Sequence, residues 1–535
     1  MVFFESEKLK KIVILSLILI VAIGVFFRFH NITENQFFYY DEGMWLNANR
    51  GFVSVVSNNP PQNFGETLKI LNVSLKLSLS SAKSLWLFLS NLRGLFASGD
   101  SWYFSRILSA IFGTLTLLLV FLFSKRYHSS NRIALLSVAL LAILPSHVYY
   151  SRLALQESLS TFCFLAGLYF YVFPRKFSIR TFISGAFFAL VFFSSYRMII
   201  IPVIIGFCEF FISFAEKQKI NFRKYFYNTL TFFFFIFVIG SINNGENIYV
   251  TFAWMFHQSN LARGHFSFIN LFSYPYYLFK LESVFFALLF FANVYFIKKK
   301  EYKCLLPFAL SMFLMALFSF PQEKGVRYLC SAMPLMVLAV SSVVAVLLDR
   351  KRKDLTKIIA IFLVVFMSLV HLVKAREIIQ FKTDYETSVE DIAKVMPNAK
   401  IVSTQDMVQS LYVEKRSNVV EAPRDFKRLL TYYAKGFRYL VVCPQAYLSY
   451  TEDKARFSSK LGNYLNFVTL NVPPVKVYKH FSPALLERFV LEHNENLINS
   501  IKFLKLAQEK NFGSLKVYSL NQCLVVMRKL AESQN

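Results

Sequence analysis

Long apolar segments separated by short polar ones recur along the first 373 residues of the chain. About eleven of them approach or reach the roughly 20 residues that a helix needs to cross a bilayer. They lie at about 12–27, 104–124, 133–150, 157–173, 181–195, 198–215, 226–242, 274–297, 304–320, 328–348 and 358–373. The pattern predicts a polytopic α-helical membrane protein with about eleven transmembrane helices.

Basic residues fall in every second polar segment of this map. With a cytoplasmic N-terminus, the inner segments each carry three to five Lys or Arg: 5–11, 125–132, 175–180, 216–224, 298–303 and 349–357. The short opposite loops carry single cations, Arg152, Arg197 and Arg263, or the pair Lys324 and Arg327. Excess Lys and Arg mark the cytoplasmic side. The alternation therefore predicts the orientation, and it explains the net charge of +27 without a nucleic-acid partner.

Two segments are too long and too polar to be simple turns between helices. The first predicted outer loop runs from 28 to 103, and its stretch 82–96 is apolar with a few polar positions. This stretch is too short to span and is typical of an interfacial amphipathic helix. The second long segment is the tail, which an odd number of spans places outside. The predicted domains are a membrane domain, 1–373, and an extracytoplasmic domain, 374–535.

The tail has short β-rich runs that alternate with helical stretches. Strands are predicted at 399–405, 438–444, 475–480 and 523–528, and a helix at 425–437. This alternation favours a small α/β domain. Cys443 and Cys523 lie in two of these runs and are interpreted as buried strand residues, with a disulfide between them as the alternative. The six cysteines form no CxxC pair. A divalent metal is possible, but no obvious ligand cluster indicates one, and no other cofactor is indicated.

Three groups of charged residues fall in the predicted outer loops. Asp41 and Glu42 follow the first apolar segment among aromatic residues; Arg152 and Glu157 lie between two predicted helices; Lys324 and Arg327 lie in a short later loop. Each group has an ordinary explanation, as solvated acids or as cations anchored at the interface. Together they suit a substrate with a phosphate at the bilayer surface. Arginine holds phosphate in a fixed bidentate geometry, and a carboxylate can act as a general base.

Four sequence stretches, in this order, resemble the GT-C membrane glycosyltransferases, specifically the branch with the protein O-mannosyltransferases and lipid A aminoarabinose transferases. The stretch "DEGMWLNANRG" (41–51) is similar to the acidic pair of that family's first outer loop. Similar stretches follow in "GDSWYFSRILSAIFGTLTLLLVFLFSKRY" (99–127), "LPSHVYYSRLALQESLSTFCFLAGLYFY" (144–171) and "VRYLCSAMPLMVLA" (326–339). The resemblance covers about residues 10–350.

The resemblance implies a GT-C fold and a glycosyltransferase that takes a sugar from a polyprenyl-phosphate donor. Asp41 would be the catalytic base, and Glu42 would support it. The substrate-binding residues would be Arg106, Arg152, Glu157, Lys324, Arg327 and Tyr328. The family's His-Pro-Pro near the interfacial helix is absent here, and Lys83 stands in about the same place, as a cation for the phosphate or a snorkelling side chain.

The predicted reaction is an inverting transfer to an acceptor hydroxyl of a lipid, a glycan or a protein. Membrane lipids are the other expected partners. The abundance of Phe, Lys and Asn is typical of a protein from an AT-rich bacterial genome. In a bacterium the predicted membrane would be the inner membrane, and the outer side, with the active site, would be periplasmic. Two alternatives stay open. A transporter for lipid-linked sugars would share the helices and the cations, although such proteins more often show repeated halves and mid-membrane charges. A non-catalytic membrane scaffold would share the helices and would use the outer tail to bind a partner, with a degenerate catalytic site.

Overall fold

The computed structural model describes most of the chain. The described residues are 7–35, 39–96, 102–173, 178–261, 268–298, 302–321, 325–348, 354–423, 425–444, 463–492, 497–498, 500–501, 504–505 and 514–533. By their internal contacts, the residues form two compact units. Unit 1 comprises residues 1–32 and 49–379, and unit 2 comprises residues 33–48 and 380–535. Part of the first predicted outer loop therefore belongs to the unit that contains the C-terminal tail.

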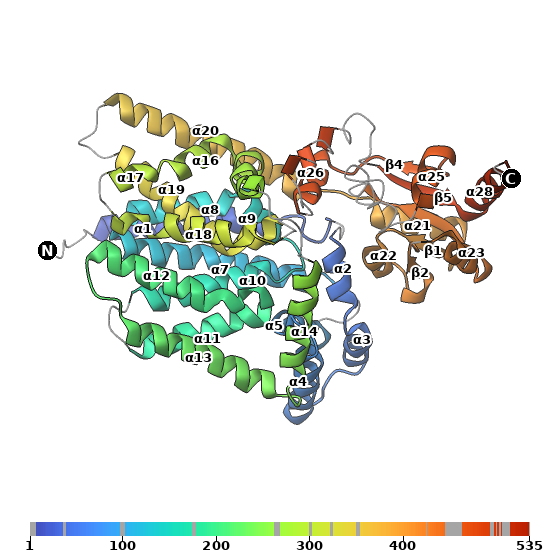
Figure 1. Ribbon diagram of the computed structural model, residues 1–535, viewed down its shortest axis with the longest axis horizontal. Coiled ribbons are helices and arrows are strands. Elements are labelled where there is room, and N and C mark those ends of the chain that lie inside the picture. Colours follow the sequence, from blue (N-terminus) through green and yellow to red (C-terminus); the bar gives the residue numbers. More distant parts are fainter. Residues whose placement is uncertain are drawn as a thin grey trace. The chain divides into compact units, whose positions relative to one another are not determined.

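Unit 1 consists of helices (Figure 1). Its α-helices are α1 (Glu7–Phe29), α3 (Arg50–Asn58), α4 (Phe64–Leu79), α5 (Ser84–Asn91), α6 (Arg93–Phe96), α7 (Tyr103–His128), α8 (Asn131–Ile143), α9 (Pro145–Tyr150), α10 (Glu157–Val172), α11 (Ile179–Ser194), α12 (Ile201–Glu216), α13 (Phe222–Ser241), α14 (Glu246–Leu261), α15 (Ser273–Tyr277), α16 (Val284–Phe291), α17 (Val294–Lys298), α18 (Leu306–Ser319), α19 (Met333–Leu347) and α20 (Asp354–Ile379). Short 3₁₀ or π turns join them: η1 (Tyr196–Ile200), η2 (Phe268–Phe272), η3 (Leu278–Glu282), η4 (Tyr302–Leu305) and η5 (Val326–Ala332).

Every predicted apolar segment overlaps an apolar helix of unit 1. Within the described residues, five helices are long and apolar enough to cross a membrane, and the pair α13–α14, bent by 112°, would make a sixth. The remaining predicted segments hold shorter apolar helices of 10–17 residues. The helical membrane architecture is confirmed, whereas the number of spans stays a prediction.

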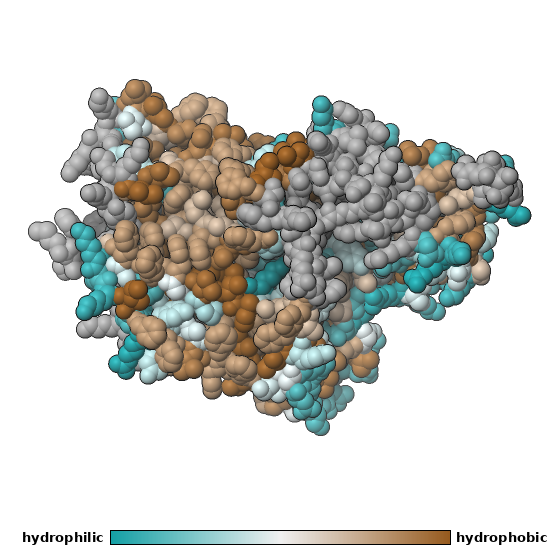
Figure 2. Space-filling view, in the orientation of Figure 1, coloured by the Kyte–Doolittle hydropathy of each residue, from teal (hydrophilic) through white to brown (hydrophobic). Residues whose placement is uncertain are grey.

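The outermost helices of unit 1 present apolar side chains to their surroundings. Leu15 on α1 is 69% exposed and Ile358 on α20 is 62% exposed, whereas α19 is almost wholly buried. On the face shown in Figure 2, hydrophobic residues cover most of this unit. Such continuous apolar surface is expected where lipid, not water, surrounds a helix bundle.

The stretch predicted as an interfacial helix does form helices, α5 and α6. They are packed more deeply than an interfacial position requires, since Trp86 and Leu87 on α5 are buried. Helix α5 packs against α4, α7 and α11. Its apolar positions therefore contact protein rather than lie on a membrane surface.

Unit 2 has a five-stranded mixed sheet in the order β2-β1-β3-β5-β4. The strands are β1 (Lys400–Ser403), β2 (Val419–Glu421), β3 (Phe437–Val442), β4 (Lys476–Tyr478) and β5 (Leu515–Ser519). Strand β1 is parallel to β2 and β3, whereas β5 is antiparallel to β3 and β4. The helices and turns are α2 (Tyr40–Asn47), α21 (Tyr385–Val395), α22 (Asp406–Gln409), η6 (Ser410–Tyr412), η7 (Arg416–Asn418), α23 (Phe426–Ala434), α25 (Asn463–Asn471), α26 (Pro483–Glu492) and α28 (Leu520–Ser533).

The tail is an α/β unit, and three of its four predicted strands correspond to β1, β3 and β4. The fourth prediction, a strand at 523–528, is wrong because these residues belong to helix α28. Leu520 and Cys523 are fully buried while Val525 is 46% exposed, which is the pattern of one helical face. Cys443 directly follows β3 and is buried as predicted, but Cys523 is helical, and both are free thiols.

Candidate functional site

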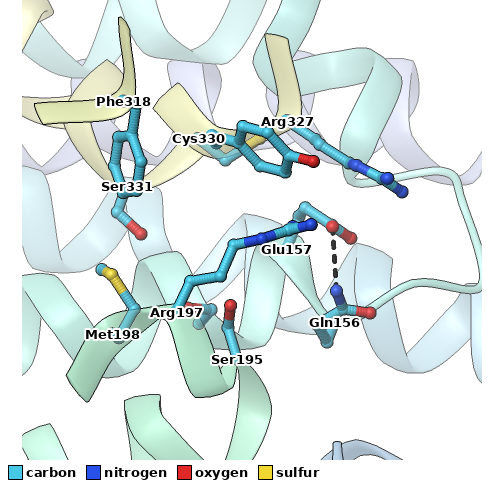
Figure 3. A pocket seen from close by; sticks show the side chains of 11 residues that line it. Gln156, Glu157, Ser195, Arg197, Met198, Phe318, Arg327, Cys330 and Ser331 are labelled. Carbon is cyan, nitrogen blue, oxygen red and sulfur yellow. Dashed lines mark hydrogen bonds between the residues drawn. The ribbon is translucent and has the colours of Figure 1, made fainter. Parts of the chain in front are cut away.

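Residues from four distant segments of unit 1 line one polar pocket (Figure 3). The segments are the start of α10, the turn η1, the end of α18 and the turn η5. The lining residues are Gln156, Glu157, Ser160, Ser195, Arg197, Met198, Phe318, Arg327, Tyr328, Cys330 and Ser331. Three predicted outer loops therefore meet at one end of the helix bundle. We call this cavity the arginine pocket.

Two arginines of the pocket lie against the same aromatic ring. The Arg197 Cζ is 4.0 Å from the centroid of the Tyr328 ring, and the Arg327 Cζ is 5.5 Å from it. Stacking on an aromatic face orients a guanidinium, and an oriented guanidinium can bind an anion through its N–H groups. Two guanidiniums fixed in this way form a site suited to a phosphate group.

Glu157 places a carboxylate in the same pocket. It is the first residue of α10, where the helix dipole favours a negative charge, and its side chain is buried. The Gln156 Nε2 donates a hydrogen bond of 3.0 Å to Glu157 Oε1, as Figure 3 shows. The pocket therefore contains a fixed hydrogen-bond acceptor beside its two cations.

An apolar pocket adjoins the arginine pocket through η5. Leu144, Tyr277, Leu278, Glu282, Phe286, Val326, Leu329, Met333 and Met336 line it. Val326 and Leu329 of η5 line the apolar pocket, while Arg327 and Tyr328 of the same turn line the arginine pocket. The turn η5 thus separates a small polar cavity of about 30 Å³ from a small apolar one of about 10 Å³.

A second cavity of about 280 Å³ lies at the other ends of the same helices. Val172 and Phe173, at the end of α10, and Glu216, at the end of α12, line it together with Arg126 and His128. Ser160 lines the arginine pocket and Val172 lines the second cavity, and these residues are about 18 Å apart along α10, because an α-helix rises about 1.5 Å per residue. Predicted inner and predicted outer loops thus lie at opposite ends of unit 1.

Arg152 holds the end of α1 rather than facing the arginine pocket. Its Nη1 donates hydrogen bonds to the carbonyl oxygens of Phe27, Arg28 and His30, at 3.0, 3.3 and 2.8 Å. A buried cation at a helix C-terminus satisfies carbonyls that the helix leaves unpaired. These contacts give the predicted substrate-binding residue Arg152 a structural role.

The predicted binding residues fall into two groups, those that line the arginine pocket and those that lie elsewhere. Of those that the structure describes, Glu157, Arg327 and Tyr328 line the arginine pocket, whereas Arg106, Arg152 and Lys83 do not. Arg106 is buried within α7, and Lys83 is half-buried at the start of α5. Lys324 lies outside the described residues.

The two predicted catalytic acids begin helix α2, in unit 2. Asp41 is half-buried in the first turn, while Glu42 is completely buried. The Tyr39 backbone N–H donates a 3.3 Å hydrogen bond to Glu42 Oε2. A glutamate at this position commonly satisfies the free N–H at the start of a helix. The structure therefore gives Glu42 a capping role at the start of α2.

Arg197 lines the arginine pocket, although its position in the sequence indicates only a loop cation. Its sequence signal is an arginine between two apolar segments on the predicted outer side. The 3₁₀ turn η1, which directs Arg197 to Tyr328, has no signature in the sequence. Within the described part of the chain, no group of three or more His, Cys, Asp and Glu residues is placed to hold a metal ion.

One family model and several solved structures are similar to this chain. A family model described as dolichyl-phosphate-mannose-protein mannosyltransferase matches residues 18–194. The archaeal oligosaccharyltransferase AglB from Archaeoglobus fulgidus, solved with an inhibitory peptide and a dolichol-phosphate, has a similar structure. The TM-score is 0.54 at 11% sequence identity, covering 82% of this chain and 70% of that chain. No curated protein matches the sequence significantly.

Two solved structures of ArnT from Cupriavidus metallidurans are also similar to this chain. The apo structure matches with a TM-score of 0.53 at 12% identity, covering 81% of this chain and 93% of that chain. The structure bound to undecaprenyl phosphate gives a TM-score of 0.53 at 11% identity, covering 87% of this chain and 96% of that chain. The chain is therefore an integral membrane protein with the GT-C fold, which confirms the predicted fold class and resemblance.

Proposed function

We propose that this protein is a glycosyltransferase that moves a sugar from a polyprenyl-phosphate donor to an acceptor hydroxyl. The observation that carries the proposal is the arginine pocket, in which Arg197 and Arg327 lie against one ring. The ArnT structure with undecaprenyl phosphate shows that one protein of this fold binds such a lipid. In the proposed complex, the two arginines bind the phosphate of the lipid donor.

The proposed reaction is a single displacement with inversion. Asp41 takes the proton of the acceptor hydroxyl while the acceptor oxygen bonds to the anomeric carbon. The bond from that carbon to the phosphate oxygen breaks, and polyprenyl monophosphate leaves with both bonding electrons. Arg197 and Arg327 stabilise the charge that develops on this leaving group, which is commonly the largest contribution of an active site. A positioned base adds roughly 10²–10⁴-fold.

The proposed location is the inner membrane of a bacterium, with the arginine pocket on the periplasmic side. The evidence is the alternation of basic segments, since the pocket is built from loops that are poor in Lys and Arg. The donor would then be used on the face opposite to the cytoplasm. Lipid, glycan and protein hydroxyls all fit the proposed chemistry of the acceptor.

Binding of undecaprenyl phosphate to the purified full chain in nanodiscs tests the phosphate site. Arg197→Ala and Arg327→Ala should each weaken binding roughly tenfold, because a charge-assisted hydrogen bond contributes about 1.5–3 kcal/mol. The double variant should weaken it about 100-fold. Arg223→Ala is the matched control, since this exposed arginine also lies over a tyrosine ring, that of Tyr227. Unchanged binding by the double variant would refute the assignment.

A further inference from the structure

Helix α2 lies in direct backbone contact with α22 of the C-terminal domain, and Gly43 makes this approach possible. A Cβ atom at residue 43 would overlap the carbonyl group of Met407 and come within 2.6 Å of the Val408 backbone nitrogen. Contacts this short with backbone atoms cannot be relieved by a side-chain rotation. A residue with any side chain would therefore push α2 away from α22.

Asn47, one turn further along α2, joins the same two segments through hydrogen bonds. Its Nδ2 donates to the Gly43 carbonyl oxygen at 2.8 Å, to the Met407 carbonyl oxygen at 2.9 Å and to Ser410 Oγ at 3.0 Å. The Asn47 side chain is buried. One amide thus fixes the end of α2 to both α22 and η6.

The chain before α2 is attached to the C-terminal domain at two further places. The Asn35 Nδ2 donates a 2.8 Å hydrogen bond to the Phe381 carbonyl oxygen. The buried Tyr39 ring lies 5.9 Å from the ring of Phe489 on α26. The attachments lie on both sides of Asp41, so the position of this residue is fixed within unit 2.

The place where α2 docks is the edge at which the parallel strands end. Helix α22 begins three residues after the end of β1, and β2 ends at Glu421 on the same edge. Open α/β sheets usually bind their ligands at the carboxyl ends of parallel strands. In this domain a segment of the same chain occupies that edge.

We propose that the C-terminal domain positions Asp41 for catalysis, and that Gly43 and Asn47 are the positioning residues through which it acts. The inference rests on the proposed function, because it takes Asp41 as the base. Helix α2 has only eight residues, and an isolated helix of that length is unstable in water. The orientation of Asp41 must therefore come from the docking, and a displacement of about 1 Å can reduce a reaction rate about 100-fold.

Three measurements on the full chain test this positioning role. Each variant is expressed in cells that lack the protein. The rate at which these cells consume the accumulated polyprenyl-phosphate sugar is then compared between variants. In purified protein, amide hydrogen exchange of residues 40–48 reports the docking of α2, and undecaprenyl phosphate affinity reports the pocket in unit 1. Gly43→Ala should slow consumption at least tenfold, accelerate exchange at least tenfold and leave the affinity within twofold.

Matched variants separate docking from general damage. Gly51→Ala adds the same methyl group at a helical glycine where no atom lies within 4 Å. Asn59→Ala removes an exposed amide that donates to the carbonyl oxygen four residues before it, as Asn47 does. Both controls should behave as wild type. Asn47→Ala should show the effects of Gly43→Ala at smaller size, and it keeps the test valid if Gly43→Ala fails to fold.

The outcomes distinguish failure of this inference from failure of the proposed function. Wild-type consumption by a Gly43→Ala protein whose α2 exchanges faster would overturn the positioning role, as would unchanged exchange. The Asp41→Asn variant should lose consumption while its exchange stays at the wild-type level. Normal consumption by Asp41→Asn would instead remove the base, and with it the proposed mechanism.

Discussion

The arginine pocket of unit 1 and helix α2 of unit 2 hold their candidate residues by different means. In the pocket, four segments that are far apart in the sequence contribute side chains, and aromatic stacking orients Arg197 and Arg327. In α2, backbone contact at Gly43 and the hydrogen bonds of Asn47 orient Asp41. The pocket should therefore be sensitive to side-chain removal, and α2 to side-chain addition.

The two regions also differ in how each buries charge. In unit 1, the buried cations Arg28 and Arg152 donate to backbone carbonyls, and the buried Glu209 pairs with Lys224. Unit 2 contains a buried carboxyl, Asp406, with Glu421 as a negative neighbour. Removing a partner should thus destabilise unit 1, whereas removing the charge of Asp406 should stabilise unit 2.

The largest expected effect concerns the two adjacent acids of α2. Asp41→Asn should reduce consumption of the polyprenyl-phosphate sugar about 10²–10⁴-fold, because an asparagine amide cannot take up the proton of the acceptor hydroxyl group. Glu42→Gln should reduce it far less, since the side-chain amide oxygen of this variant can still accept the Tyr39 N–H. The measurement is the level of the lipid-linked sugar in cells restored with each variant. Glu34→Gln, an exposed acid in the same unit, is the control. Equal losses for Asp41→Asn and Glu42→Gln would contradict the distinction between base and cap.

The second prediction tests the carbonyl-bound cations of unit 1. The Arg28 side chain donates to the carbonyl oxygens of Gly24, Ala142 and Leu141, and its Nη2 lies 2.7 Å from His147 Nδ1. Arg28→Met should lower the free energy of unfolding by about 3 kcal/mol, because buried acceptors lose their donors.

The readout for Arg28→Met is the midpoint of thermal unfolding of the purified chain in detergent. A decrease of several degrees is expected. Arg223→Met, at an exposed arginine, should leave the midpoint unchanged. A wild-type midpoint for Arg28→Met would show that the bundle does not depend on these hydrogen bonds.

The third prediction concerns the pH dependence of unit 2. Burial, with the negative charge of Glu421, raises the pKa of Asp406 to about 6. In the unfolded chain an aspartate has a pKa near 4, so the unfolded state loses this proton at a lower pH than the folded state does. The free energy of unfolding of unit 2 should therefore fall as the pH rises from about 4 to about 6, by at most about 3 kcal/mol.

Asp406→Asn should remove that pH dependence and make unit 2 more stable than wild type at pH 7. Hydrogen exchange of strands β1 and β3 in the full chain, at pH 5 and at pH 7.5 after correction for the intrinsic rate, measures the effect. An Asp406→Asn protein that is less stable than wild type at pH 7 would contradict this prediction and would show that the folded unit stabilises the Asp406 carboxylate.

The smallest expected effect comes from an ion pair on the surface of the same unit. The Lys476 ammonium bonds to the Asp391 carboxylate and lowers the pKa of that carboxyl to about 2. Its contribution is therefore present above about pH 4 and is lost as the pH falls towards 2, the opposite sign to Asp406. Asp391→Asn should cost less than about 1 kcal/mol at pH 7, because exposed pairs contribute little. A larger cost, measured by the same exchange experiment, would contradict this ranking.

The helical architecture of unit 1 could be predicted because one property determines it. A span needs a long run of apolar residues, and such runs are visible without knowledge of the fold. The breaks within these helices were not visible in the same way. Segment 274–297, for example, forms α15, η3 and α16–α17 instead of one helix.

The sequence could not predict which residues meet at the site, because the contacts that bring them together join segments far apart in the chain. Arg152 resembled a phosphate ligand by position and sign, but its neighbours are the carbonyls that end α1. Arg197 had the same local signals, and only the turn η1 places it over Tyr328. The attachment of α2 to α22 joins residues more than 350 positions apart, through a glycine whose role appears only beside Met407.

The most direct test of the central claim is whether the purified chain breaks the sugar–phosphate bond of a polyprenyl donor. The substrate is the lipid-linked sugar extracted from cells that lack the protein, incubated with their cell-envelope fraction as the source of acceptor. We predict that the wild-type chain releases free polyprenyl phosphate and that Asp41→Asn releases at least 100-fold less. A donor that stays intact with the wild-type chain would contradict the account and indicate a transporter or a scaffold instead.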